Sequence, residues 1–207
     1  MTEKNPKRFD FLIKQALELG AVNAKIIPTS KIVIEDRVVL KCSMGCEKYG
    51  KTLACPPHSP TPDEFRKIVH EYRYAIFMKF ASKAEATSDL IPYLAKSNSI
   101  PQEIKAKVDA FWSSWKVDMQ RLLEVILNLE KVAFNGGYPL SVGFVSGSCQ
   151  LCEKCNVEKG FCIHPETRRY SEEGLGVNVK ATAEKAGMKF TLPFKKNPET
   201  FALLLID

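Results

Sequence analysis

The sequence predicts an α/β (α+β) sandwich, in which helices flank a mixed β-sheet and two cysteine-rich loops leave that sheet. Segments with helical spacing of apolar residues alternate along the chain with short runs rich in Val, Ile and aromatic residues. With 207 residues, 45% of them hydrophobic and 26% charged, the chain is long and apolar enough to bury a core. We therefore expect a single domain over residues 1–207, with the cysteine-rich loops at residues 42–60 and 147–165.

The first part of the chain is expected to hold one helix and two strands. Residues 7–19 repeat apolar side chains at helical spacing, and Gly20 follows where a helix would end. Residues 21–27 and 32–40 are rich in Val and Ile, which predicts two strands. The second of these strands would lead directly into the first cysteine-rich loop.

The middle of the chain is expected to hold two helices with clear start signals. Residues 61–64, Thr-Pro-Asp-Glu, form a capping box with Pro at the first helical position, so a helix begins there and reaches about residue 70. Residues 74–80 then predict a buried strand, and residues 82–99 predict a loop. A second capping box at residues 99–102 opens a long helix, because apolar residues continue in steps of three and four until the Asn-Gly-Gly at 135–137.

Three short elements complete the prediction. Residues 140–145 read as a strand, residues 177–186 as a short helix closed by Gly187, and residues 200–206 as a final strand.

The composition argues against several classes of protein. No apolar run approaches the roughly 20 residues of a membrane helix, and the first six residues lack the apolar centre of a signal peptide. We therefore expect a cytoplasmic protein with no membrane partner. The net charge of +6 is spread over short, separate groups, so no nucleic-acid partner is expected. The sequence leaves the oligomeric state open.

The second cysteine-rich loop holds four thiols within fourteen residues: Cys149, Cys152, Cys155 and Cys162. Three cysteines at successive two-residue gaps allow a tight loop to hold three corners of a [4Fe–4S] cluster, and the longer gap allows the fourth cysteine to close it. Zinc is the alternative, although zinc sites normally use two separated C-x2-C pairs. The spacing favours an iron–sulfur cluster and leaves zinc open.

The first cysteine-rich loop holds Cys42, Cys46 and Cys55, with His58 close behind them. Three thiolates suit a [4Fe–4S] cluster with one iron left for a substrate or another ligand. The same residues suit a zinc site in which His58 is the fourth ligand. The spacing differs from the C-x3-C-x2-C of radical S-adenosylmethionine enzymes, so that chemistry is not expected. All seven cysteines are therefore candidate metal ligands.

Several short motifs around these cysteines resemble a known family. They are Leu40-Lys41-Cys42, Tyr49-Gly50, Cys55-Pro56-Pro57, Cys162-x-His164-Pro165 and the closing Leu203–Asp207. Together they resemble a prokaryotic family of predicted metal-binding proteins, domain of unknown function 2284, over roughly residues 30–207. The resemblance implies metal or iron–sulfur binding through the seven cysteines, and it implies no established reaction.

Three functions are compatible with these observations. The leading hypothesis is an iron–sulfur protein with two [4Fe–4S] sites that exchanges electrons with a redox partner protein. The alternative is an enzyme that binds a small-molecule substrate at an open iron of the three-cysteine cluster, for example in sulfur transfer. A third is a zinc-stabilised binding module without redox function. Whether the protein is an enzyme is left open at this stage.

Overall fold

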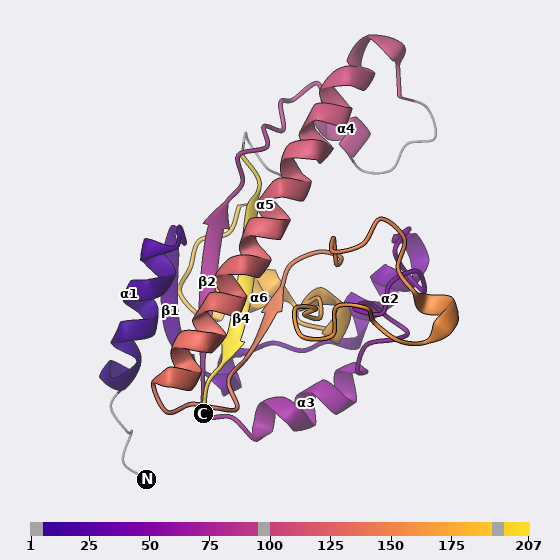
Figure 1. Ribbon diagram of the computed structural model, residues 1–207. Helices are drawn as coiled ribbons and strands as arrows, with labels where there is room; N and C mark the ends of the chain where they lie inside the picture. The colour runs from indigo at the N-terminus through magenta and orange to yellow at the C-terminus, as the bar shows by residue number, and fades with distance from the viewer. Residues whose placement is uncertain (1–5, 95–99, 192–196) are drawn as a thin grey trace.

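The computed structural model describes residues 6–94, 100–191 and 197–207. Its centre is a four-stranded sheet in the order β1-β2-β4-β3, in which every neighbouring pair is antiparallel (Figure 1). The strands are β1 (Asn23–Pro28), β2 (Tyr74–Ala81), β3 (Val142–Val145) and β4 (Glu199–Leu205).

The predicted α/β class is confirmed, but the predicted mixed pairing within the sheet is wrong. β2 and β3 run in the same direction and are joined by a helical crossover, as a mixed sheet requires. The C-terminal strand β4 inserts between them and pairs antiparallel with both. The strands that share a direction are therefore never neighbours in this sheet.

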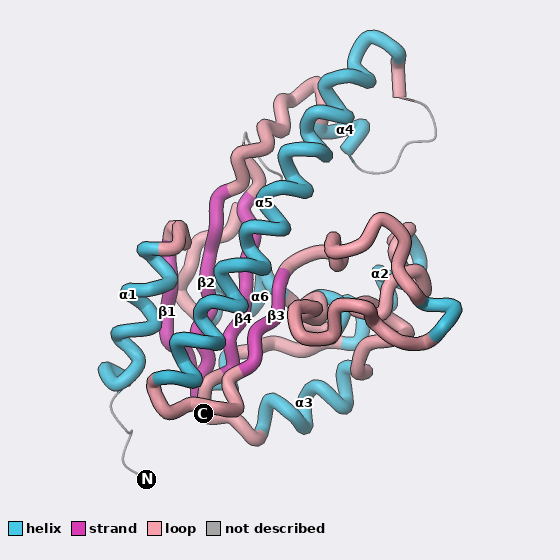
Figure 2. Tube along the Cα trace, viewed as in Figure 1, coloured by secondary structure: helices cyan, strands magenta, loops and turns pink. Residues whose placement is uncertain are grey.

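Helices cover both faces of the sheet, as the secondary-structure colouring shows (Figure 2). Ile76 and Met78 of β2 point to one face and pack in a core with two helices, whereas Ala75 and Phe77 point to the other. This alternation is the two-residue period of a strand buried on both sides. The first face carries α1 (Asp10–Glu18) and α5 (Gln102–Asn135), and the second carries α3 (Pro62–His70) and α6 (Val179–Lys185).

The start of α3 confirms the first capping box. The Glu64 amide donates to the Thr61 hydroxyl at 3.3 Å, and the Thr61 amide donates to the Glu64 carboxylate at 2.7 Å. The second predicted capping residue, Ser99, lies outside the described residues, and α5 follows Pro101 directly. Its N-terminal half extends beyond the sheet and packs against α4 (Ile91–Leu94), a short helix within the segment predicted as a loop.

The strand predicted over residues 32–40 is wrong. Only Ile34 makes a β-bridge there, to Val177, and the chain then turns into the helix α2 (Asp36–Gly45). The backbone of Val33 finds its partners at the start of α6 instead of in a strand. Its amide donates to Thr182 Oγ1 at 3.0 Å, and its carbonyl accepts from the Asn178 amide at 2.8 Å. These tertiary contacts override the local β-propensity of Val and Ile.

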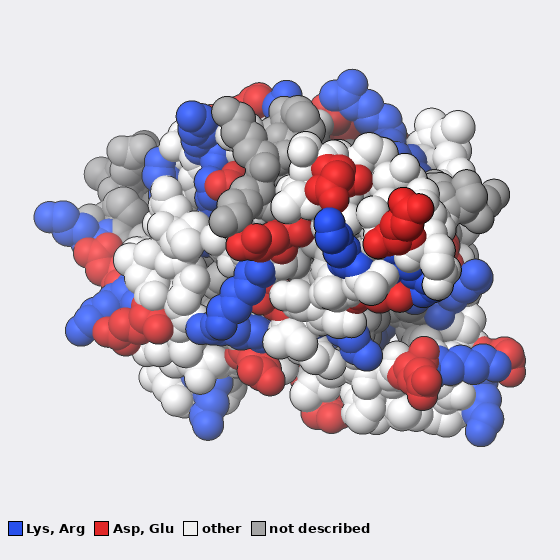
Figure 3. Space-filling view, turned by 90° about the horizontal axis from the view of Figure 1, so that it is seen from above, with Lys and Arg blue, Asp and Glu red and all other residues white. Residues whose placement is uncertain are grey.

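The cysteine-rich segments form a lobe at the β3 end of the sheet. In Figure 1 the orange segment that follows β3 lies beside α2, and α2 also contacts the short turn η4 (Glu173–Leu175). Seen from above, basic and acidic side chains are interspersed over the described part of the surface (Figure 3). Over the residues that the structure describes, no helix is long and apolar enough to span a membrane.

Candidate metal centre

The first window, Cys42 to Cys55, takes its three thiols from a helix and the turn that follows it. Cys42 is half-buried on α2, Cys46 is exposed at the end of α2, and Cys55 is 8% exposed. The prediction that this window is wholly a loop is therefore wrong for Cys42. The cause is the helix that replaces the predicted strand, which carries Cys42 one turn before its end.

Each thiol of the first window lies within electrostatic reach of another. Burial raises the pKa of Cys42 to about 11, and repulsion from Cys46, from Glu173 and from Cys55 adds to the effect, while Lys41 opposes it. Burial also raises the pKa of Cys55, whereas the nearby Thr52 hydroxyl lowers it. A bound metal would replace these thiol protons, so binding at this site releases protons and strengthens as pH rises.

The second window, Cys149 to Cys162, gathers its four half-buried thiols within one irregular loop. Burial raises the pKa of Cys149, and the charges of the other three thiols raise it further. Gly160, with φ at +74°, lets the chain reverse before Cys162. The His164 amide then donates to Cys162 Sγ at 3.4 Å. Cys149 thus lies within electrostatic reach of the other three cysteines of the predicted group.

The two windows touch, although 93 residues separate Cys55 from Cys149 in the sequence. The Leu53 amide donates to Cys155 Sγ at 3.4 Å, and the charge of Cys149 raises the pKa of Cys55. The Ser171 amide, which follows the second window, donates to the Ala54 carbonyl at 3.4 Å. All seven predicted cysteines therefore lie in one lobe, as two groups that share a boundary.

His58 follows the first window, and its backbone amide donates to the Cys55 carbonyl at 3.0 Å. The His58 imidazole is exposed, and its Nε2 is 3.4 Å from the Gly50 carbonyl oxygen. Its role as a fourth ligand of the first window stays a prediction. In the part of the chain that the structure describes, no three His, Cys, Asp or Glu side chains converge on a single-ion geometry. The thiols are neighbours, and all seven are free.

The donor set fits a thiolate-bound metal centre. Seven uncombined thiols lie in one lobe, and backbone amides of Leu53 and His164 already point at two of the sulfurs. Amide donors to ligand sulfurs are the usual surroundings of metal-bound thiolates. The thiolate forms of these cysteines repel one another, and a bound cation would offset that repulsion.

A buried carboxyl beside this lobe was not found from the sequence. The tandem Glu172-Glu173 suggests caps and surface positions, yet Glu172 is 0% exposed. Burial raises the pKa of Glu172 well above its usual range, and the charge of Glu173 adds to this, whereas the Ser146 hydroxyl opposes it. Nothing in the local sequence distinguishes this glutamate from an exposed one, because its burial depends on the strand order.

Glu173 faces the cysteines instead. Its Oε2 accepts the Gly147 amide at 3.1 Å and the Ser171 hydroxyl at 2.7 Å. Its charge raises the pKa of both Cys42 and Cys55. The two adjacent carboxyls therefore occupy different environments, one inside the core and one at the candidate centre.

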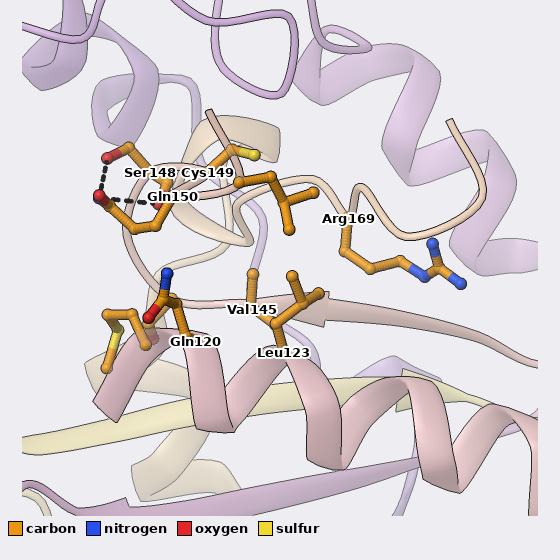
Figure 4. Close-up of a pocket in the computed structure, with 10 residues that line it drawn as sticks. Gln120, Leu123, Val145, Ser148, Cys149, Gln150 and Arg169 are labelled. Carbon is orange, nitrogen blue, oxygen red and sulfur yellow. Dashed lines mark hydrogen bonds between the residues drawn. The ribbon is translucent and has the colours of Figure 1, made fainter. Parts of the chain in front are cut away.

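A small cavity lies between α5 and the start of the second window (Figure 4). Its volume is about 20 Å³, and Gln120, Leu123, Val145 and Cys149 are among its lining residues. The Gln150 side chain closes on Ser148, donating to its carbonyl at 3.3 Å and to its hydroxyl at 3.1 Å. This volume corresponds to about one water molecule.

The segment that follows the second window is bound to α5 by an ion pair. Arg169 binds the Glu130 carboxylate of α5 with two of its nitrogens, and the side chains are 17% and 13% exposed. The same carboxylate accepts the Gly143 amide of β3 at 2.6 Å. The helix α5, the strand β3 and the segment that follows the second window therefore all contact the Glu130 carboxylate.

The fold and the lobe define a cysteine-rich α/β protein with a candidate metal centre. A protein family described as predicted metal-binding protein, DUF2284, matches residues 25–206, and the chain belongs to this family. The matched segment contains both windows and the contacts between them. Neither the search of the curated proteins nor the search of the solved structures returned a match.

Proposed function

We propose that the protein binds two [4Fe–4S] clusters, one in each window, and exchanges electrons with a redox partner protein in the cytoplasm. The observation that carries this proposal is the gathering of all seven free thiols into one lobe, as a group of four and a group of three. Soft thiolate ligands suit iron–sulfur clusters. Free thiols also suit a reducing compartment.

In the second window, the residues proposed as ligands are Cys149, Cys152, Cys155 and Cys162. A cluster held there would accept and return one electron at a time. The amides of Leu53 and His164 donate to two of these sulfurs and favour the more negative, reduced state. The protein's part is to fix the ligands and to set the potential.

Analysis of metal and sulfide in protein purified without oxygen tests this proposal. We expect about eight irons per chain, an equal amount of acid-labile sulfide and broad absorption near ~400 nm from sulfur-to-iron charge transfer. Zinc in both windows without sulfide would overturn the proposal and favour the zinc-stabilised module.

A second candidate function rests on the first window. It offers three cysteines, and the His58 ring lies against the Gly50 carbonyl. A cluster with three protein ligands would leave one iron for a small-molecule substrate, which makes the protein an enzyme, for example in sulfur transfer. Added cyanide or a small thiol should then change the spin-resonance signal of this cluster alone. A change that appears only in His58→Ala would instead mean that His58 closes the site, in favour of electron transfer.

A further inference from the structure

A buried segment, Thr52–Cys55, joins the two windows. Leu53 is 8% exposed and Ala54 is 1% exposed, so the segment is shielded from water. It supplies Cys55 to the first window, and two residues earlier its Leu53 amide donates to Cys155 Sγ of the second. This is a short connection between ligand sulfurs of the two groups.

Arg168 holds the segment from its other side. Its Nη1 donates to the Leu53 carbonyl at 2.5 Å. The guanidinium carbon lies 4.6 Å from the centre of the Tyr170 ring, and Nη2 is 3.4 Å from the Tyr170 hydroxyl. Because the planar guanidinium is fixed on the ring, it presents its donor to Leu53 in one orientation. The Leu53 carbonyl therefore accepts from Arg168, while the Leu53 amide donates to Cys155 Sγ.

We propose that Arg168 is a positioning residue, which sets the reduction potential of the second-window centre by holding the Leu53 amide on Cys155 Sγ. This inference rests on the proposed function. An amide that donates to a ligand sulfur stabilises the reduced state, so its displacement lowers the reduction potential. The same contact makes Thr52–Cys55 the path by which electrons pass between the two centres.

Two variants separate positioning from charge. Arg168→Met removes the charge and the contact with Leu53. Tyr170→Leu keeps the charge and frees the guanidinium from its ring. Lys154→Met is the matched control, because Lys154 is a cation of the second window that pairs only with Glu158 among the described residues and its side chain is 83% exposed. A Cys46→Ser variant identifies which signal belongs to the second window.

The measurement is a redox titration followed by spin resonance, on proteins of equal iron and sulfide content. We expect Arg168→Met to lower the equilibrium constant for reduction of the second-window centre about tenfold. This corresponds to a reduction potential lower by about 59 mV for one electron. Tyr170→Leu should lower it less, and Lys154→Met should leave it nearly unchanged. In the wild type, reduction of both centres should produce a spin–spin interaction that weakens in Arg168→Met.

Several outcomes would overturn the inference. One is a shift in Arg168→Met no larger than in Lys154→Met. If Arg168→Met fails to fold, a wild-type potential in fully loaded Tyr170→Leu is sufficient to overturn it. Absence of iron and sulfide from the wild type overturns the proposed function as well, whereas two normal clusters with an unchanged potential overturn only the role of Arg168.

Discussion

The hydroxyl of Ser146 faces two acceptor oxygens with only one proton to donate. Glu172 Oε1 lies 2.9 Å from it and the Phe201 carbonyl oxygen 2.8 Å from it. Both contacts are satisfied when Ser146 donates to Phe201 and Glu172 carries its own proton, which it donates to Ser146. Burial, which raises the pKa of Glu172, acts in the same direction. We therefore predict that Glu172 is a neutral acid inside the core, because burial outweighs the opposing effect of the Ser146 hydroxyl on its pKa.

Glu172→Gln should stabilise the protein at neutral and alkaline pH. The folded pKa of Glu172 is raised, so the stability linked to its proton is complete below the unfolded pKa and is lost as pH rises toward the folded value. Each unit of elevation is worth about 1.4 kcal/mol, and Gln keeps the neutral shape without this loss. Urea unfolding at pH 5 and pH 8 should show a gain that is larger at pH 8.

The exposed residue Glu166 supplies the control for this measurement, since Glu166→Gln removes a carboxylate at the surface. Its unfolding free energy should follow that of the wild type at both pH values. Parallel profiles for Glu172→Gln and the wild type would show that Glu172 is ionised in the folded protein.

The thiols of the first window should differ in reactivity when no metal is bound. Cys46 is exposed, whereas Cys55 is 8% exposed and burial raises its pKa. At pH 8, iodoacetamide should modify Cys46 well before Cys55, as mass spectrometry of peptides would show. Loading with iron and sulfide should protect both. Equal rates in the metal-free protein would contradict the burial of Cys55.

At the scale of elements, the ion pair between Arg169 and Glu130 should stabilise the packing of α5 against the segment that follows the second window. Arg169→Met leaves the largely buried Glu130 carboxylate without its cation and should lower the free energy of unfolding by about 3 kcal/mol. This value is at the low end for the loss of one partner of a buried ion pair, because both side chains keep some exposure to solvent. Lys105→Met breaks an exposed pair with Asp109 on the same helix and should cost under about 0.5 kcal/mol. Equal losses of unfolding free energy in Arg169→Met and Lys105→Met, measured by urea unfolding, would contradict the stabilising role of the Arg169–Glu130 pair.

The sequence predicted an element correctly where the contacts that form the element lie within a few residues of one another. The capping box at Thr61 fixes the start of α3 through contacts within four residues, so the sequence is enough to find it. The strand predicted over residues 32–40 does not form because its local propensity competes with a tertiary partner, Thr182 of α6, which lies 149 residues after Val33 in the chain. The antiparallel pairing of the sheet likewise depends on a distant segment, because β4, near the C-terminus, inserts between β2 and β3.

At the scale of the whole molecule, the sequence identified the cysteines but not their common neighbourhood. Short spacing groups thiols within one loop, which is why each window was predictable. The contact between the windows depends on the strand order, which places the segment after β3 beside α2. Arg168 gains its role only through that contact, and Glu172 is buried beside Ser146 because of the same strand order, so no local pattern marks either residue.

Iron counting, window by window, tests the central claim of two clusters in one lobe. Each protein would be loaded with iron and sulfide without oxygen, and both elements would be measured per chain. We predict about eight irons in the wild type and about four in Cys46→Ser and in Cys152→Ser, with Cys152→Ser also less resistant to thermal unfolding because ligand binding contributes to folding. Full iron content in either variant, or zinc in place of iron in the wild type, would contradict the account.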